Sequence, residues 1–446
     1  HPAWHRRGFH TRAHTRKARV TVPRPALYIC NLRGGEMARG APVRNPAAKN
    51  RAAPNSRVVV SVKRLFSQES PHYVVMVAIV LFLVIFGLVM VLSSSFVDSA
   101  LGNDGNFFAV FLRQAMWVLI GIPVMFLLAR VQPIAILRAA PAGLLAAFFL
   151  QSLVFTPLGV TSGGNRNWIA LGNFSAQPSE LLKVTLILWM AAILSSRLEA
   201  IGELRTLVTP LGIGVVASIG MVMVGGDLGT VGVMVVVVIG VVFLAGVRLR
   251  HLASILVVVA VLGAMAALFA PSRVRRISTW FSGCTEDEYL TTCWQTVHST
   301  FALGSGGVFG VGLGNSRAKW SWLPEAETDF IFAIVGEELG LLGAGLVIVC
   351  FVVLAVTMAH LVRKNPDPFA RLVTAGVMVW LIGQALINIA VVLELLPVLG
   401  IPLPFMSVGG SALLSSLAAV GIVMALNRAG AISVTEHYSA TRGRRR

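Results

Sequence analysis

Long apolar runs separated by short polar connections occupy the chain from about residue 70 to residue 430. A helix needs about 20 apolar residues to cross a bilayer, and a window of about 19 residues finds ten such runs. Runs of this length are too long for barrel strands, so the pattern predicts an all-α polytopic membrane protein. The predicted spans are 73–94, 107–129, 133–155, 179–196, 206–224, 227–247, 251–270, 329–362, 369–397 and 407–427.

Basic residues in the short connections orient these spans. Lys63 and Arg64 precede the first span, and Lys and Arg recur in every second connection, for example at Arg130 and Arg248. By the positive-inside rule, both termini and these connections are expected on the cytoplasmic side. A large extracytoplasmic loop, residues 271–328, is then predicted between the seventh and eighth spans.

Composition supports the membrane assignment. The chain has 446 residues, of which 56% are hydrophobic and 13% charged, whereas soluble domains carry roughly 25% charged residues. The net charge of +18 could suggest nucleic-acid binding. However, it is concentrated in residues 1–66, where Glu36 is the only acid. Because this segment has no pattern of interleaved aromatic residues, we interpret it as a tail facing anionic lipid and expect no nucleic-acid partner.

Three parts are expected along the chain. Residues 1–66 are a disordered basic cytoplasmic tail, residues 67–430 the transmembrane domain, and residues 431–446 a second basic tail. The chain opens with His1, so we hypothesise that translation starts at Met37 and that residues 1–36 are not translated. A peptide from upstream of Met37 would refute this hypothesis. No cleavable signal peptide is expected, because the first apolar run is too long.

Ionisable residues border the predicted spans near the outer face. Glu180 and Lys183 lie three positions apart on one helix. They either neutralise each other within the helix or line a polar cavity inside the bundle. Asp227 begins the sixth span and either caps that helix or offers its carboxylate to the same cavity. The connection 156–178 before Glu180 is expected to be an outer loop.

The large outer loop carries charge of both signs. Arg273, Arg275 and Arg276 are interpreted either as anchors to lipid headgroups or as a clamp for a pyrophosphate. Three consecutive acids, Glu286, Asp287 and Glu288, form either a solvated turn or a reactive group. Cys284 and Cys293 flank them, and an oxidising compartment outside the membrane permits a disulfide between them. Whether that bridge forms is left open.

Residues 304–314, here called the glycine loop, are rich in glycine and superficially resemble phosphate-binding loops. They lack the strand–loop–helix context and face outward, so we expect tight backbone packing or re-entry at the membrane edge. Glu325 and Asp329 precede Phe330 at the start of the eighth span, and Glu337 lies deeper within it. A buried Glu337 requires a polar pathway or buried hydrogen bonds. Ser407 and Ser411 open the tenth span, where helix capping is expected.

Seven strings occurring in order over residues 70–430 resemble the SEDS family (shape, elongation, division and sporulation), and more closely its division-type than its elongation-type members. The strings are Asn165-Arg-Asn-Trp168, Gln177-Pro-Ser-Glu-x-x-Lys183, Asp227-Leu-Gly, Gly312-Leu-Gly-Asn-Ser316, Leu323-Pro-Glu-Ala-x-Thr-Asp-Phe-Ile-Phe332, Glu337-Glu-Leu-Gly340 and Pro402-x-Pro-Phe-x-Ser-x-Gly-Gly-Ser411.

This resemblance implies a peptidoglycan glycosyltransferase that joins lipid II into β-1,4-linked strands and releases polyprenyl diphosphate. Inversion at the anomeric carbon needs one general base on the attacking hydroxyl. The family places its essential aspartate in the large outer loop, which implies Asp287 here, with Glu286 and Glu288 as alternatives. The Asp-Pro pair of many members is absent, and Val408 replaces a common aromatic residue.

The resemblance also implies substrate contacts, a partner and a location. Arg166, Arg276 and Lys319 are the outward-facing cations expected to stabilise the departing diphosphate, with a divalent cation (Mg²⁺ or Mn²⁺) as a further candidate. A class B penicillin-binding protein and other division proteins are the expected partners, at the septum of a bacterial cell membrane. The remaining expected substrate-binding residues are Trp168, Glu180, Lys183, Asp227, Ser316, Glu325, Asp329, Glu337, Ser407 and Ser411.

Two alternatives belong to other classes of protein. A lipid II flippase would use a polar cavity formed by Glu180, Lys183, Asp227 and Glu337, although the chain shows no internal repeat of the kind that transporters carry. A non-catalytic scaffold for division proteins would need no reactive residue. Labelled lipid II in liposomes distinguishes the three: polymer indicates an enzyme, movement without polymer a flippase, and neither a scaffold.

Overall fold

The computed structural model describes residues 70–428 with gaps, and everything below concerns this part of the chain. The gaps are residues 98, 100–105, 163, 173, 198–203, 249, 255–256, 258–270, 290–292 and 321. The two predicted tails, 1–66 and 431–446, lie outside the described residues. So does most of the predicted seventh span, 251–270.

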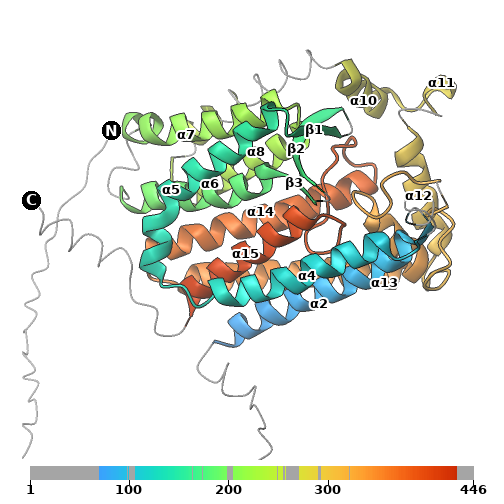
Figure 1. Ribbon diagram of the computed structural model, residues 1–446, viewed down its shortest axis with the longest axis horizontal. Helices are drawn as coiled ribbons and strands as arrows, with labels where there is room; N and C mark the ends of the chain where they lie inside the picture. The colour runs from blue at the N-terminus through green and yellow to red at the C-terminus, as the bar shows by residue number, and fades with distance from the viewer. Residues whose placement is uncertain are drawn as a thin grey trace, which may run out of the picture. The chain divides into compact units, whose positions relative to one another are not determined.

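Helices occupy the other nine predicted spans, as Figure 1 shows. Among the described residues, seven helices are long and apolar enough to cross a membrane, while α7 and α8 contain shorter apolar helices. The prediction of a polytopic helical membrane protein is therefore confirmed. The helices are α2 (Pro71–Ser94), α4 (Ala109–Leu128), α5 (Pro133–Ser152, extended by the 3₁₀ turn Leu153–Phe155), α6 (Pro178–Ser195), α7 (Leu204–Val224), α8 (Leu228–Leu244), α13 (Ile331–Lys364), α14 (Pro368–Val392) and α15 (Gly410–Asn427).

One helix end differs from its prediction. The ninth span was predicted to reach residue 397, but α14 ends at Val392. Glu394 adopts a left-handed backbone with a φ of 60°, which a continuing α-helix of L-residues does not tolerate. The chain therefore leaves the helix two residues after Val392 and runs irregularly to α15.

Helix α14 lies in the middle of the bundle and packs against α6, α8, α13 and α15 (Figure 1). Gly376 makes this close packing feasible, because a Cβ there would come within 2.6 Å of Ile187 on α6 and 2.9 Å of Val241 on α8. Small residues at such contacts are how helices approach each other when lipid offers no hydrophobic driving force. Around this centre, α15 packs on α4, α2 on α13, and α5 on α6.

The connection 156–178 is a small antiparallel sheet, which the sequence analysis missed. Strand β2 (Asn165–Leu171) pairs with β1 (Gly159–Ser162) and with β3 (Phe174–Ala176). Arg166 N donates to Gly225 O at 2.8 Å, so the sheet is joined to the turn between α7 and α8. The all-α prediction is correct for the spans and wrong for this connection.

The glycine loop packs against a break in α13. Gly340 has a φ of 66° inside the helix, and a Cβ there would lie 2.4 Å from Gly310 N. A Cβ on Gly310 would in turn lie 2.1 Å from Glu338 O. Glycine is needed on both sides of this contact, so the prediction of tight backbone packing is confirmed.

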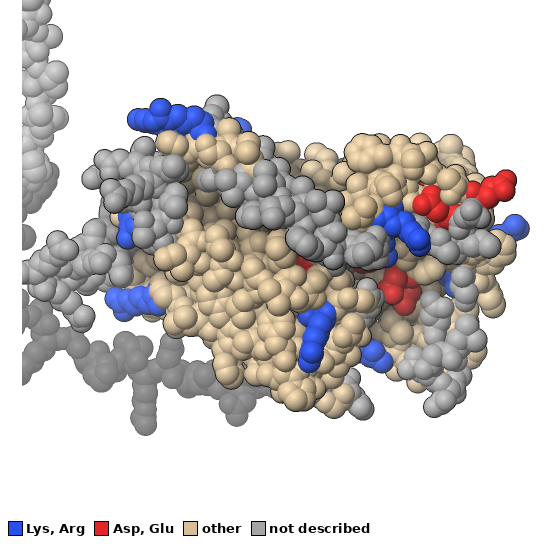
Figure 2. All heavy atoms as spheres, turned by 90° about the horizontal axis from the view of Figure 1, so that it is seen from above, with Lys and Arg blue, Asp and Glu red and all other residues tan. Residues whose placement is uncertain are grey.

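The predicted outer loop folds into three further helices, α10 (Pro271–Ser282), α11 (Glu286–Tyr289) and α12 (Trp294–Gly306). Figure 1 shows them at one end of the bundle, with the basic connection between α4 and α5 at the opposite end. On the face drawn in Figure 2, the described Asp and Glu side chains gather toward the end that carries α10–α12. This distribution agrees with the orientation predicted from the basic connections.

Candidate functional site at the outer end of the bundle

Asp227 joins the sheet, α6 and α8 at the outer end. Its carboxylate caps α8 by accepting from Thr230 N at 3.0 Å and from Thr230 Oγ1 at 2.8 Å. It also accepts from Asn167 Nδ2 on β2 and from Gln177 Nε2 before α6, each at 2.8 Å. Asp227 thus caps its helix, as one interpretation predicted, and it holds β2 and Gln177 in place, but it is not among the residues that line the cavity described below.

Glu180 and Lys183 form the predicted pair on α6. Lys183 Nζ lies 2.9 Å from Glu180 Oε1, and both side chains are buried. The ammonium also donates to Gln384 Oε1 at 3.1 Å and lies 4.8 Å from the centre of the Trp380 ring. Trp380 Nε1 donates to the same Gln384 oxygen at 2.8 Å. These contacts keep the cation oriented within the bundle.

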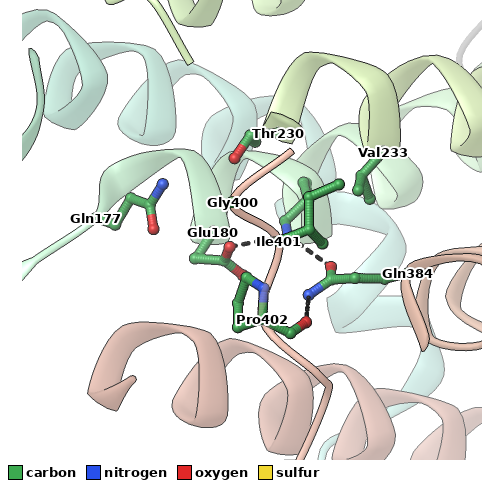
Figure 3. A pocket seen from close by; sticks show the side chains of 9 residues that line it. Gln177, Glu180, Thr230, Val233, Gln384, Gly400, Ile401 and Pro402 are labelled. Carbon is green, nitrogen blue, oxygen red and sulfur yellow. Dashed lines mark hydrogen bonds and ion pairs between the residues drawn. The ribbon is translucent and has the colours of Figure 1, made fainter. Parts of the chain in front are cut away.

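A polar cavity of about 30 Å³ lies beside this pair and is shown in Figure 3. Glu180 Oε2 has no hydrogen-bond partner among the described residues. One or two water molecules fit such a volume, and a buried carboxylate oxygen needs a donor of this kind. A sugar does not fit. The cavity is lined by Gln177, Glu180, Lys183, Thr230, Val233, Gln384, Gly400, Ile401 and Pro402.

Asp329 lies at the edge of this cavity, just before α13. Its carboxylate is 3.6 Å from the position that a Cβ on Gly400 would take, and Gly400 lines the cavity. Burial, together with the negative charges of Glu325 and Asp227, raises the pKa of Asp329 to about 7, against the opposing effect of Arg276. Asp329 therefore holds a proton near neutral pH more readily than an ordinary aspartate.

Helices α10 and α11 form an arm over the connection between α14 and α15. Trp280 Nε1 donates to Glu394 O at 2.9 Å, and Arg276 Nη1 donates to Val398 O at 3.5 Å. The disulfide that the sequence left open is present, with the Cys284 and Cys293 Cα atoms 6.1 Å apart. It ties the arm to the start of α12, so the arm is held above the segment that leads to the cavity-lining residues 400–402.

The three consecutive acids of the arm differ in what surrounds them. Glu288 accepts from Thr279 Oγ1 at 2.9 Å and from Thr285 Oγ1 at 3.1 Å. The Thr279 hydrogen bond first, and then those of Thr285, lower the pKa of Glu288. Glu286 is exposed, and the side chain of Asp287 on α11 lies outside the described part of the chain. A carboxylate with a lowered pKa is a weaker base than an ordinary one. Of the three acids expected to supply the general base, Glu286 and Asp287 are therefore the better candidates.

Glu337 and Lys319 do not lie where a substrate could reach them. Glu337 Oε2 accepts from Ser316 Oγ, and its Oε1 accepts from Arg317 N at 2.9 Å. Lys319 is buried and lies 3.5 Å from Glu338 Oε1. Glu337 therefore anchors residues 316–318 by buried hydrogen bonds rather than lining a pathway. The prediction that Lys319 faces outward is wrong, because Glu338 holds its charge inside.

Other predicted contacts are also engaged within the fold. The Arg166 guanidinium donates to Val154 O at 3.0 Å and to Thr156 O at 2.8 Å, which ties β2 to the end of α5. Ser407 Oγ donates to Thr328 O, and Ser411 Oγ accepts from Gln177 N at 3.1 Å. Arg166 uses two of its donors within the fold but remains exposed, so it still faces outward as predicted. Both serines hold the ends of neighbouring segments together.

Trp168 and Glu325 lie at the outer end and are not among the residues that line the cavity. Trp168 is half-buried and pairs with Val160 in the sheet. Glu325 is exposed with a φ of 59°, and its Oε2 accepts from Thr328 Oγ1 at 2.6 Å. Glu325 influences the site through its charge, which acts on Asp329.

Sequence reasoning missed Gln384 and Asn388, which lie one turn apart on α14. Gln384 Nε2 donates to Pro402 O at 2.8 Å, and Asn388 Nδ2 donates to Asp329 O and Ile401 O, each at 2.7 Å. They fix the 401–402 segment as a wall of the cavity. The available signal was two amides in an otherwise apolar span, since polar groups within the membrane are usually retained for such contacts.

A resident metal does not fit the described side chains. Among them, no three His, Cys, Asp or Glu groups come together in a way that could hold an ion. The acids of the outer end are either engaged by hydrogen bonds or spread around the cavity. The expected Mg²⁺ or Mn²⁺ remains a prediction that concerns Asp287 and the substrate.

Comparisons with known proteins agree over most of the chain. A profile of cell cycle proteins covering FtsW, RodA and SpoVE matches residues 73–431. The probable peptidoglycan glycosyltransferase FtsW of Mycobacterium tuberculosis is 36% identical over 348 residues, which cover 78% of this chain and 66% of the relative. The stage V sporulation protein E of Bacillus subtilis is 38% identical over 356 residues, covering 79% of this chain and 96% of the relative.

Two solved structures share the fold. A chain from a peptidoglycan synthase complex that coordinates polymerization and crosslinking superposes with a TM-score of 0.65 at 25% identity, covering 79% of this chain and 96% of that chain. The rod shape determining protein RodA of Thermus thermophilus superposes with a TM-score of 0.58 at 26% identity, covering 79% of this chain and 95% of that chain.

Proposed function

Since the chain belongs to the family of cell cycle proteins that contains FtsW, RodA and SpoVE, we propose that it is a peptidoglycan glycosyltransferase of the FtsW type. It is a multi-pass membrane protein that polymerises lipid II into β-1,4 glycan strands. The chain spans 66% of the length of the mycobacterial FtsW relatives that it matches. The observation that carries the proposal is this identity to proteins named as glycosyltransferases, which extends over nearly the whole transmembrane domain.

The proposed reaction is one inverting displacement outside the membrane. The 4-hydroxyl of one sugar attacks the anomeric carbon of another, whose bond to the diphosphate breaks while a base takes the hydroxyl proton. Asp287 is the proposed base. Support comes from its place on α11 in the disulfide-tied arm, and from the hydrogen bonds that occupy its neighbour Glu288.

Cations on the same arm are proposed to stabilise the leaving diphosphate. Arg275 and Arg276 are exposed on α10, and guanidinium groups match the geometry of phosphate oxygens. Of the three expected cations, Arg276 and Arg166 remain candidates because both are exposed, whereas Lys319 is buried beside Glu338. The polyprenyl tail of the substrate is too apolar to cross the outer polar end, so it is proposed to lie against the helices in the bilayer.

The decisive experiment uses the purified full chain in liposomes with labelled lipid II. We expect glycan polymer from the wild type and from Glu286→Gln, and none from Asp287→Asn, with the melting temperatures of all three unchanged. Full activity of Asp287→Asn with loss in Glu286→Gln would transfer the role of base to Glu286. Movement of lipid II across the membrane without polymer would indicate a flippase instead of an enzyme. The absence of both polymer and movement would favour a scaffold.

Two further parts of the proposal concern partners and metal. A class B penicillin-binding protein that crosslinks the product, with other division proteins, is proposed to join the chain at the septum. The similarity to a chain from a peptidoglycan synthase complex supports this. Polymerisation that survives EDTA treatment would remove Mg²⁺ or Mn²⁺ from the scheme.

A further inference from the structure

The glycine loop exposes large apolar side chains at the outer end of the bundle. Phe309 is 81% exposed, Leu313 57%, Val308 53% and Val311 41%. Single apolar residues on a surface need no explanation, but four within six positions form a contiguous patch that ordinary water-facing loops avoid. The surroundings of the loop decide what covers this patch.

The depth of the loop follows from its contact with α13. After the break at Gly340, residues 341–364 of α13 form a helix of about 36 Å at 1.5 Å per residue, which matches a hydrocarbon core of about 30 Å. Leu341 and Leu342, 67% and 60% exposed, begin its lipid-facing stripe. That stripe continues through Val349 to Val356. Leu341 and Leu342 therefore mark the outer edge of the hydrocarbon.

Backbone hydrogen bonds fix the loop at this same level. Leu341 N donates to Gly307 O at 2.9 Å, and Leu342 N donates to Val308 O at 3.3 Å. Val308 thus lies directly beside the first lipid-facing turn of α13, and the loop cannot rise into water without breaking these bonds. Its apolar patch is continuous with the lipid-facing stripe of a membrane span.

Three backbone N–H groups of the loop donate to carbonyl oxygens of the protein, as a position at membrane depth requires. Non-helical backbone is tolerated at membrane depth only where protein satisfies its hydrogen bonds. Val311 N donates to Glu337 O and Gly312 N to Glu338 O, each at 3.0 Å, and Gly310 N donates to Gly306 O at 2.8 Å. The Lys319 ammonium group donates to Gly314 O at the end of the loop and lies 3.5 Å from Glu338 Oε1, so its charge is held inside the protein.

Two tryptophans complete the pattern. Trp320 and Trp322 follow the loop and are 62% and 58% exposed. Tryptophan is enriched at membrane–water interfaces, where its ring lies at the level of the headgroups. Their position between the apolar loop and the polar residues 324–329 is the order expected on passing from hydrocarbon to water.

We propose that the glycine loop is inserted in the outer leaflet, with Val308 and Phe309 in contact with lipid acyl chains and Trp320 and Trp322 at the headgroup level. The loop is thereby a fixed apolar wedge beside α13. This inference rests on the packing of the loop and on its depth in the membrane, so it does not depend on the proposed reaction.

Spin labelling of the full chain tests the depth of Phe309. Phe309→Cys is labelled in a background carrying Cys30→Ser and Cys350→Ala, with the Cys284–Cys293 disulfide intact, in vesicles of phosphatidylethanolamine and phosphatidylglycerol. We expect collisions with oxygen to exceed those with a water-soluble nickel chelate several-fold, as at Val349→Cys on α13. Thr161→Cys, exposed on strand β1, should show the reverse.

Two results would overturn the proposal. Nickel accessibility at position 309 equal to that at position 161 would place the loop in water. Poor accessibility to both reagents would mean that protein covers it, whether a second copy or a partner. Wild-type protein gives a readout free of folding effects: lipids with a diazirine in the acyl chain should crosslink to the peptide that contains residues 307–314. Labelling of α13 without labelling of this peptide would also contradict the wedge.

Discussion

Two buried ion pairs in this molecule are built differently. Glu338 and its neighbour Glu337 have all four carboxylate oxygens hydrogen-bonded, by Ser93, Ser316, Arg317, Ala318 and Lys319. Glu180 uses one oxygen for Lys183 and leaves the other facing a cavity with room for water. Glu337 and Glu338 hold two segments together, whereas the second oxygen of Glu180 remains available to a water molecule or a proton.

The difference shows that burial by itself does not identify a functional residue. Glu337 and Glu180 are equally buried, at 2% exposure each, and for each of them a polar cavity or pathway was one of two interpretations. What separates them is the number of hydrogen bonds that each carboxylate accepts. Both oxygens of Glu337 have partners, whereas one oxygen of Glu180 can still accept a hydrogen bond. Four predictions test this distinction, and they are given in order of decreasing effect on stability.

Glu338→Ala should have the largest effect. It leaves the buried Lys319 charge without a carboxylate, a loss that costs about 3–5 kcal/mol of folding free energy. Thermal unfolding in detergent measures it. Adding Lys319→Met should restore part of the loss, since no unpaired charge then remains. If Glu338→Ala melts like the wild type, the anchor role of this pair is wrong.

Gly310→Ala tests the same anchor from the backbone side. A Cβ there would lie 2.1 Å from Glu338 O at a φ of 80°, so we expect a loss of about 2–4 kcal/mol from strain and displacement. Gly304→Ala in α12 is the matched control, because nothing lies within 4 Å of its Cβ. That control should be neutral or stabilising by about 0.5–1 kcal/mol. Equal melting temperatures for both variants would contradict the packing argument.

Glu180→Gln should be milder than Glu338→Gln. Water in the cavity can solvate the altered group, whereas Glu338 is fully buried with both oxygens hydrogen-bonded. We therefore expect Glu180→Gln to cost about 1–2 kcal/mol. Glycan polymerisation in liposomes is the second readout, and it should fall while the protein remains folded. A melting temperature lowered as much as in Glu338→Gln would erase the difference between the two pairs.

Asp329→Asn should have the smallest effect, visible as a change in pH dependence. The pKa of Asp329 is raised to about 7 from an ordinary 3.8, so the folded state binds its proton more tightly than the unfolded state. The resulting stability is present at low pH and is lost as pH rises toward and through 7. The melting temperature of the wild type should therefore fall between pH 5 and pH 8 more steeply than that of Asp329→Asn. Parallel curves would contradict the raised pKa.

Sequence patterns predicted the nine described helices, because an apolar run of sufficient length is a local feature. Two cysteines nine residues apart allowed the disulfide but did not decide whether it forms. Sequence patterns could not predict where long-range partners meet. Ser93 reaches Glu338 across 245 positions, and Asn167 reaches Asp227 across 60. The three-stranded sheet was missed because its strands are short and carry few β-branched residues.

The Cys284–Cys293 disulfide also sets an order of events during synthesis. Such a bond forms in an oxidising compartment and not in a reducing cytoplasm. The arm that carries Glu286, Asp287 and Glu288 can therefore be tied to α12 only after its loop has crossed the membrane. The closed arm is therefore a product of the outer compartment, the side on which the proposed reaction takes place.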